Sequence, residues 1–439
     1  MKIALISLGC PKNQVDADCM AHALLQAGHT TVASVEEAQC VLINTCGFIE
    51  SAKQEAIDTI LEACSHKAQN PALKVVVTGC LAERYQQEIR KEMPEVDAVV
   101  GIGSNAAIAS ILERLERGET GIESYGPKAA LPLSGKRVIS TPRHYAYLKI
   151  AEGCSNCCTY CAIPLIRGPL RSRTVESCVA EARWLAGEGV KELIVVAQDI
   201  TAFGADRGKV EIARLLDELN KVEGIVWIRL LYAYPERITD EFVAAMVRNK
   251  KVLHYLDVPI QHIDSDVLRA MNRKGDEGTV RAALEKLRTA MPDITLRTTL
   301  IAGFPGETPA QFEKLCAFVR QQNFARLGCF AYSEEEGTKA AQMTQMPLAV
   351  REQRAEAVMR IQTDHMAARQ AALVGTQAQV LCDGWDEENG LWLCRTRADA
   401  PDIDAVVCVD GNAALTPGEF YTVRIIDSDV YDLYATLAE

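Results

Sequence analysis

The sequence predicts an α/β protein with an amino-terminal doubly wound parallel sheet, a central (β/α) barrel and a small carboxyl-terminal β-barrel. Two stretches in which short apolar runs alternate with amphipathic helix patterns predict the first two parts. Five short apolar runs between Gly, Asp and Asn turns predict the small barrel. At 439 residues the chain is too long for one ordinary core, so several domains are expected.

The first predicted domain covers residues 1–125. Its buried runs predict parallel strands, and amphipathic segments such as "ESAKQEAIDTILEAC" predict the helices between them. The expected strands lie at residues 2–9, 39–47, 73–80 and 96–101. The next stretch, residues 126–142, is rich in Gly, Pro, Ser and Lys and is typical of a linker.

The second predicted domain covers residues 143–370 and contains six β/α units, which fit a partial or full barrel. The expected strands lie at residues 144–153, 191–199, 224–235, 252–262, 293–304 and 326–337. In such barrels the chemistry takes place on the loops that follow the strands. Residues 371–439 form the third predicted domain, the small β-barrel.

The composition is that of a globular protein, with 48% hydrophobic and 24% charged residues. No apolar run approaches the length of a membrane span, so we expect a cytoplasmic protein without membrane association. Sixteen cysteines are many for a reducing compartment, where a disulfide framework is not expected. They therefore raise the question of metal ligation or catalysis, although most of them can pack as small hydrophobic residues.

Cys154, Cys158 and Cys161 have CxxxCxxC spacing in "EGCSNCCTYCAIP", directly after the first predicted barrel strand. Three thiolates can hold three irons of a [4Fe-4S] cubane and leave the fourth iron open to an outside ligand. Cys157 adds overlapping CxxC steps, so a four-cysteine zinc site or a dithiol redox motif are alternatives. The abutting spacing favours the cluster, because a zinc site usually needs a second CxxC far along the chain.

This segment resembles the radical S-adenosylmethionine superfamily, in which the open iron binds the amino acid end of S-adenosylmethionine. Tyr160, the aromatic residue before the third cysteine, fits that pattern. "TLIAGFPGET", which contains Gly303, resembles the strand and loop that contact the cofactor. The resemblance also implies cofactor contacts for Gln198, Asp199 and Arg297, although each of these can instead cap a strand end or form a salt bridge.

A second group of cysteines lies in the first domain. Cys10, Cys46 and Cys80 each follow a predicted parallel strand, and strand ends of this kind meet at one rim of a sheet. The alternative is three separately packed core cysteines. The neighbouring loop-forming residues in "SLGCPKNQ", "NTCGFIES" and "TGCLAER" favour cluster ligation instead.

Together these motifs make the whole chain resemble the methylthiotransferase family, with a cluster domain, a radical barrel and a TRAM β-barrel. "LGCPKNQVD", "INTCGFI", "EGCSNCCTYCAIPLIRGPLRSR", "YLDVPIQH", "GFPGET" and "FAYSEEEGT" carry the resemblance. It implies two [4Fe-4S] clusters, S-adenosylmethionine and a reducing protein such as a flavodoxin or ferredoxin. Cys154, Cys158 and Cys161 would hold the radical-forming cluster, and Cys10, Cys46 and Cys80 the sulfur-carrying one. A non-enzymatic iron–sulfur carrier remains an alternative.

Members of that family modify either tRNA or a ribosomal protein, and charge helps to separate the two. From Ala371 onward there are thirteen acidic residues against Arg395, Arg397 and Arg424, a net charge of −10. Such a domain should repel a phosphate backbone and attract a basic protein. The alternative is an acidic face that only aids solubility. "ADAPDIDAVVCV" and "DVYDLY" resemble the branch that thiomethylates an aspartate β-carbon in the twelfth small-subunit ribosomal protein, which makes tRNA the less favoured substrate.

Three arginines follow the CxxxCxxC motif in "IRGPLRSR", namely Arg167, Arg171 and Arg173. They have two interpretations of equal weight. They can steer an acidic side chain or the cofactor carboxylate to the site, or they are ordinary surface charges.

Overall fold

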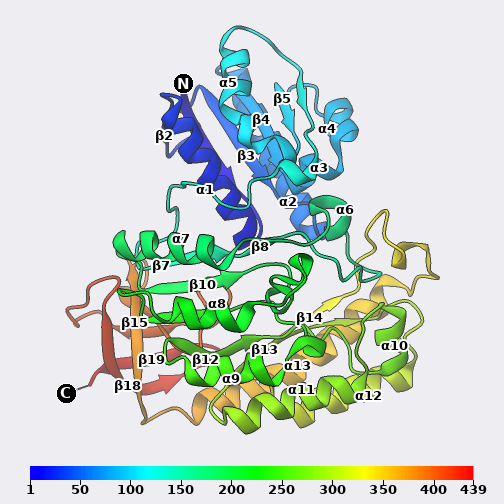
Figure 1. Ribbon diagram of the computed structural model, residues 1–439, viewed down its shortest axis with the longest axis vertical. Coiled ribbons are helices and arrows are strands. Elements are labelled where there is room, and N and C mark those ends of the chain that lie inside the picture. The colour runs from blue at the N-terminus through cyan, green and yellow to red at the C-terminus, as the bar shows by residue number, and fades with distance from the viewer. Residues whose placement is uncertain (439) are drawn as a thin grey trace. The chain divides into compact units, whose positions relative to one another are not determined.

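A computed structural model describes residues 1–438, which form two compact units (Figure 1). The first unit contains Met1–Ser140, Ala151–Arg173 and Ser333–Ala341, and the second contains the other described residues. The CxxxCxxC loop therefore belongs to the same unit as the amino-terminal sheet. Among residues 1–438, no helix has both the length and the apolar character needed to cross a membrane.

Six parallel strands form the sheet of the first unit, in the order β2-β1-β3-β4-β5-β6. The strands are β1 (Lys2–Ser7), β2 (Thr30–Val32), β3 (Cys40–Thr45), β4 (Lys74–Gly79), β5 (Ala98–Val100) and β6 (Ile122–Ser124). The helices are α1 (Pro11–Gln26), α2 (Glu50–Ser65), α3 (Cys80–Arg84), α4 (Gln86–Glu92) and α5 (Ile108–Glu116). The strand order reverses between β1 and β3, so the predicted doubly wound sheet is confirmed. A reversal of this kind leaves a crevice at the carboxyl ends of the two strands.

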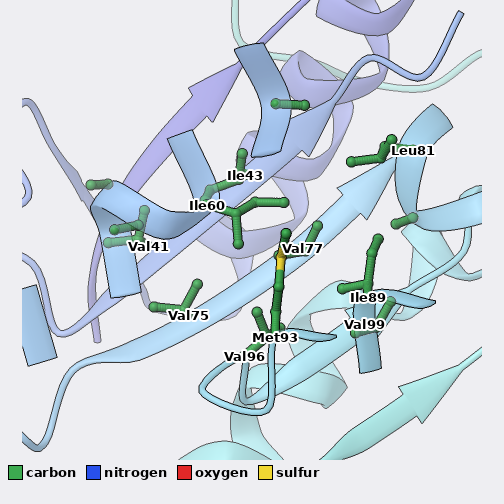
Figure 2. Close-up of a cluster of buried hydrophobic side chains, with 14 of the residues drawn as sticks. Val41, Ile43, Ile60, Val75, Val77, Leu81, Ile89, Met93, Val96 and Val99 are labelled. Atoms are coloured by element: carbon green, nitrogen blue, oxygen red, sulfur yellow. The ribbon is translucent and has the colours of Figure 1, made fainter. Parts of the chain in front are cut away.

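Alternate residues of the central strands pack on opposite faces of this sheet, as the two-residue period of a strand requires. On one face Ile43 and Val77 lie in a cluster with Ile60 of α2, and all three are fully buried (Figure 2). Leu42 and Val76, their neighbours in sequence, join a second cluster with residues of α1 and α5. Apolar layers therefore cover both faces of the sheet. Because side chains on both faces are buried, successive residues of each central strand are apolar.

The CxxxCxxC loop contributes three short elements to the first unit. They are β8 (Ala151–Glu152), α6 (Ile163–Arg167) and β9 (Arg171–Ser172). β8 and β9 pair as antiparallel strands, so the loop between them is closed at its base. This pairing places the three cysteines of the motif in a loop with both ends held together.

The second unit contains a six-stranded parallel sheet in the order β14-β13-β12-β11-β10-β7, which confirms the predicted β/α alternation in a partial barrel. Its strands are β7 (Tyr145–Lys149), β10 (Glu192–Val196), β11 (Trp227–Leu230), β12 (Val252–Asp257), β13 (Thr295–Ala302) and β14 (Arg326–Ala331). Its helices are α7 (Val175–Gly187), α8 (Ile212–Leu219), α9 (Asp240–Arg248), α10 (Ser265–Ala270), α11 (Glu277–Ala290), α12 (Pro309–Gln322) and α13 (Leu348–Ala371). Threonine or aspartate side chains cap α7, α9, α10, α11 and α12.

The predicted carboxyl-terminal β-barrel is confirmed as a closed barrel in the order β15-β16-β17-β19-β18. Its strands are β15 (Gln377–Asp386), β16 (Leu391–Thr396), β17 (Val407–Asp410), β18 (Phe420–Ser428) and β19 (Leu433–Leu437). Val380, Val407 and Val423 form its core together with Cys382 and Cys394, which are fully buried. These two cysteines therefore pack as small hydrophobic residues.

A buried network of charges joins the small barrel to the parallel sheet of the second unit. Arg395 of β16 donates to Glu192, the first residue of β10, at 2.8 Å and to Asp383 at 2.6 Å. Arg326, the first residue of β14, pairs with Asp399. These contacts lie at the starts of the sheet strands, whereas the sites of such folds lie at the strand ends.

Ile60 and Leu61 of α2 offer a test of the first core. Ile60→Ala should lower the free energy of unfolding by about 2–5 kcal/mol, because Ile60 is fully buried and its truncation leaves a cavity. Leu61→Ala should change it by less than about 0.5 kcal/mol, because Leu61 is 50% exposed. Urea unfolding monitored by circular dichroism measures both values, and equal losses would contradict the packing of α2.

The Arg395 network predicts a dependence of stability on pH. Burial alone would raise the pKa of Glu192 and Asp383, but Arg229 and Arg395 hold the pKa of Glu192 low, and His144 and Arg395 hold that of Asp383 low. Their stabilising effect is therefore present above pH 4.5 and is lost as the pH falls through the lowered values. Arg395→Met should lower the free energy of unfolding by about 3–5 kcal/mol at pH 7, because it leaves buried carboxylates without their cation.

The difference in free energy of unfolding between wild type and Arg395→Met should narrow as the pH falls from 4.5 through the lowered pKa values of Glu192 and Asp383, because protonated carboxyls lose their attraction to the Arg395 charge. Thermal unfolding of both proteins from pH 3 to pH 8 measures this difference. Arg424→Met is the control, since the Arg424 guanidinium donates to the Gly375 carbonyl at an exposed position. If the stability difference between wild type and Arg395→Met stays constant from pH 3 to pH 8, the ion pairs of Arg395 with Glu192 and Asp383 do not stabilise the fold.

Candidate functional site

The structure brings Cys10, Cys46 and Cys80 to the carboxyl ends of three adjacent strands, β1, β3 and β4. Cys10 is the N-cap of α1, Cys46 directly follows β3, and Cys80 begins α3. Parallel strands that lie side by side end at the same edge of a sheet. The three sulfur-bearing residues, which are far apart in sequence, therefore share the crevice at the reversal of the strand order.

Two glycines show how closely these turns approach one another. A methyl group on Gly9 would lie 2.9 Å from the Cys46 sulfur, and the Gly9 φ angle is +87°. A methyl group on Gly47 would lie 2.7 Å from the Leu81 Cα atom, beside Cys80. Only glycine permits such contacts, so the Cys46 turn touches the turns of both Cys10 and Cys80.

Two buried asparagines hold the rim of the crevice. The Asn13 amide donates to the backbone carbonyls of Leu8 at 2.8 Å, Asn44 at 3.3 Å and Thr45 at 3.2 Å. The Asn44 amide donates in return to the Asn13 carbonyl at 2.7 Å. These bonds tie the ends of β1 and β3 to α1. Neither asparagine was predicted as a site residue, although both lie in the motifs "LGCPKNQVD" and "INTCGFI".

Arg167 reaches the same crevice from α6. Its side chain is 1% exposed, and its Nε atom donates to the Cys80 sulfur at 3.4 Å. Its Nη1 atom donates to Asp16 and Glu152, each at 2.9 Å, and its Nη2 atom donates to the Asn13 side-chain oxygen at 3.1 Å. The interpretation as a surface charge is therefore wrong for Arg167. Arg171, by contrast, donates to backbone carbonyls of the 128–131 segment.

The three thiols experience different electrostatic environments. Burial raises the pKa of the Cys80 thiol to about 12, even though Arg167 opposes this effect. Burial also raises the pKa of Cys46. For Cys10 burial acts in the same direction, but Lys12, Arg167 and the backbone N–H groups of α1 outweigh it and lower the pKa. The thiolate, which is the form that binds metal, is therefore favoured most at Cys10.

The second cysteine group lies in the loop between β8 and α6. Cys154 and Cys158 are buried, and Cys161 is half-buried. Burial raises the pKa of Cys161, and the Cys158 and Cys154 sulfurs raise it further. The Cys161 N–H donates to the Cys158 carbonyl at 3.1 Å, so these two residues lie in one tight turn. Cys157 differs from them, because it is exposed and its φ angle of +54° is left-handed.

The two cysteine groups adjoin each other within the first unit. Cys80 forms an apolar cluster with Ala162 and Ile166, and Ala162 directly follows Cys161. The segment 333–341 is part of the same unit, where the Ala340 N–H donates to the Thr159 carbonyl at 2.9 Å. Its buried Glu335 accepts from Arg84 at 2.6 Å, and Arg84 ends α3. The segment 333–341, which begins within the "FAYSEEEGT" motif, thus fastens the CxxxCxxC loop to the helix of Cys80.

The predicted contacts to S-adenosylmethionine are distributed over both units. Tyr160 lies in the CxxxCxxC loop of the first unit, and Gln198 follows β10 in the second. The Asp199 carboxylate accepts from the Thr201 and Ala202 N–H groups and pairs with Arg237 at 2.7 Å.

Arg297 and Gly303 are the other two predicted contacts. Arg297 lies in the first half of β13, where it pairs with Asp257 at 3.2 Å and Asp404 at 3.6 Å. Gly303 has a φ angle of +73°, and its N–H donates to Glu307 at 2.9 Å. The charges of Asp199 and Arg297 are therefore already matched within the protein. All five cofactor contacts stay predictions.

The donor chemistry of both cysteine groups fits an iron–sulfur cluster. Each group offers three sulfurs from buried or half-buried positions, and the three ligands of a cubane bind three different irons rather than one ion. A single zinc ion would need its sulfurs at about 2.3 Å from one point. Within residues 1–438, no three His, Cys, Asp or Glu side chains converge in this way on a single ion.

Comparison with known families accounts for most of the chain. Residues 2–101 match an uncharacterized protein family, UPF0004, residues 148–319 match the radical SAM superfamily, and residues 374–437 match the TRAM domain. The structure also resembles the radical S-adenosylmethionine methyltransferase TsrM from Kitasatospora setae, with a TM-score of 0.58 and 13% identity over 86% of this chain and 78% of that one. At this identity the likeness shows the fold alone.

Curated relatives match over nearly the whole length. A protein of Acetivibrio thermocellus is 44% identical over 98% of this chain and 97% of its own, and one of Geobacter sulfurreducens is 45% identical over 98% and 97%. A protein of Trichlorobacter lovleyi is 45% identical over 100% of this chain and 98% of its own. All three are named ribosomal protein uS12 methylthiotransferase RimO. With three matching domains and this identity over its full length, the chain belongs to the RimO family of radical SAM methylthiotransferases.

Proposed function

We propose that this protein transfers a methylthio group to the β-carbon of an aspartate in the ribosomal protein uS12. The observation that carries the proposal is the placement of both cysteine groups in one compact unit, with Cys80 packed against α6. A sulfur-transfer enzyme of this type needs its radical-forming and sulfur-carrying centres close together. The RimO names of the relatives, which match over the whole chain, support the choice of substrate.

Each cysteine group would hold one [4Fe-4S] cluster, and S-adenosylmethionine would occupy the open iron at Cys154, Cys158 and Cys161. When bound, the two clusters and S-adenosylmethionine would supply the reductive cleavage of S-adenosylmethionine and the sulfur that is transferred. The chain itself provides the geometry. Asn13 and Asn44 keep the Cys10 and Cys46 turns together, and the burial of Cys80, Cys154 and Cys158 excludes water and oxygen from the sulfurs.

The small barrel supports a basic protein as partner, although less of its negative charge is available than its composition implies. Asp383, Asp399 and Asp404 pair with arginines inside the second unit. Glu387 and Glu388 are exposed on the turn between β15 and β16, beside Trp385, which is 43% exposed. This surface, which we call the acidic turn (residues 385–388), offers an indole ring and negative charge to a basic polypeptide.

The test is anaerobic turnover by the reconstituted full-length protein with S-adenosylmethionine, a flavodoxin or chemical reductant, and purified uS12. Mass spectrometry of uS12 should show one added methylthio group on an aspartate, and deoxyadenosine should form in the same reaction. Deoxyadenosine without modified uS12, together with modification of added tRNA, would move the protein to the tRNA branch. If an iron-replete sample gives neither product, the proposal is wrong.

Cysteine variants should separate the two groups. Cys158→Ala should abolish deoxyadenosine formation, because it removes one thiolate of the radical-forming site. Cys46→Ala should preserve deoxyadenosine formation and abolish methylthio transfer, because it affects only the other site. Cys157→Ala is the matched control beside Cys158, and it should preserve both iron content and turnover because Cys157 is exposed. Iron loss in Cys157→Ala would contradict the assignment of ligands.

The acidic turn predicts a salt-dependent interaction with uS12. Glu387→Lys/Glu388→Lys should weaken binding on the order of tenfold at low ionic strength, and the difference should shrink as salt screens the charges. Glu241→Lys/Glu285→Lys makes the same change in net charge at exposed positions of α9 and α11 and should have little effect. Binding is measured by fluorescence anisotropy of labelled uS12, and equal losses in both variants would show that only net charge matters.

A further inference from the structure

The buried side chain of Arg167 connects several segments of the first unit. Its guanidinium is almost fully buried and contacts residues of three separate segments: α1 (Asn13 and Asp16), β8 (Glu152) and α3 (Cys80). A buried arginine is costly unless its donors are paired, and here each of its three nitrogens has a partner.

The two carboxylates fix the direction of that donor. Asp16 and Glu152 both accept from Nη1, and Asn13 accepts from Nη2. The planar guanidinium is therefore held by its two terminal nitrogens. Its Nε–H bond is then left to face the Cys80 sulfur. Such outer partners orient the groups that contact metal ligands in other proteins, and their loss typically costs about 10–100-fold in metal affinity.

We propose that Arg167 is a positioning residue for the Cys10, Cys46 and Cys80 site, where it supplies the positive charge and the N–H···S bond against which an anionic cluster is held. This inference rests on the proposed function, because it takes these cysteines as cluster ligands. It goes further by assigning a shared positioning role to Arg167 and to the two carboxylates that hold it, Asp16 and Glu152. The CxxxCxxC segment would then hold one cluster with its cysteines and orient the other with its arginine.

The expected effect is on the reduction potential of that cluster. A positive charge and an N–H···S bond both favour the more negative, reduced state of a cluster, so they raise its potential. Arg167→Met removes both and should shift the potential to more negative values. Arg167→Lys keeps the positive charge but lacks the planar set of N–H donors of a guanidinium. The potential of the cluster in this variant should therefore lie between those in the wild type and in Arg167→Met.

The experiment uses the full chain with Cys154→Ala/Cys158→Ala/Cys161→Ala, so that only the amino-terminal cluster forms. The midpoint potential is measured by a redox titration monitored by electron paramagnetic resonance, and iron loss to a chelator is measured by absorbance. Arg167→Met should lower the potential and speed iron loss by about 10–100-fold. Arg171→Met is the control from the same segment and should change neither, because Arg171 contacts backbone carbonyls of the 128–131 segment.

Arg167→Met leaves two buried carboxylates without their cation, which can prevent folding. Arg167→Met/Glu152→Gln removes one charge of each sign and keeps the net charge of the site. If Arg167 only neutralises Glu152, this double variant should have the wild-type potential, and the inference is overturned. If Arg167 acts on Cys80, the potential should remain low in the double variant although the protein is folded.

These measurements need neither uS12 nor turnover, so they distinguish the inference from the proposed function. If the triple cysteine variant binds no cluster, the amino-terminal cluster is refuted and the inference with it. If the cluster forms and Arg167→Met leaves its potential and iron loss unchanged, only the role of Arg167 is refuted, and the methylthiotransferase proposal stands.

Discussion

The first unit depends on one geometric constraint, the common edge at which adjacent parallel strands end. Because β1, β3 and β4 run side by side in the same direction, the residues that follow them meet at one rim. Cys10, Cys46 and Cys80 occupy those positions. The close approach of their turns leaves no room for a side chain at Gly9 or Gly47, and the hydrogen bonds between Asn13 and Asn44 keep the rim from opening.

In each of the two units a buried arginine joins segments that are distant in sequence. In the first unit Arg167 joins α6 to α1, β8 and α3. In the second unit Arg395 joins the small barrel to Glu192 at the start of β10. The physical reason is the same in both cases, since a buried guanidinium is stable only when acceptors surround it in the plane of its fork. Each arginine therefore fixes where its partners must lie.

The charge network of the second unit also changes how the acidic composition of the small barrel should be interpreted. Asp383, Asp399 and Asp404 are counted as acidic residues in the sequence, but they balance Arg395 and Arg326 within the fold. The exposed acids at the turn between β15 and β16 remain available to a partner. A count of charges thus overestimates how strongly the small barrel would attract a basic partner, because the count cannot distinguish a paired carboxylate from a solvated one.

The sequence by itself determined the fold class, because the periodicity of buried and exposed residues is local and distinguishes strands from helices. It also placed Cys10, Cys46 and Cys80 at strand ends and grouped Cys154, Cys158 and Cys161 by their spacing. Only the tertiary structure decided that residues 151–173 belong to the same unit as the amino-terminal sheet and that Arg167 is buried against Cys80. It likewise placed Arg297 beside Asp404. These facts depend on contacts between residues far apart in sequence, and the partner that will satisfy a buried charge leaves no local pattern.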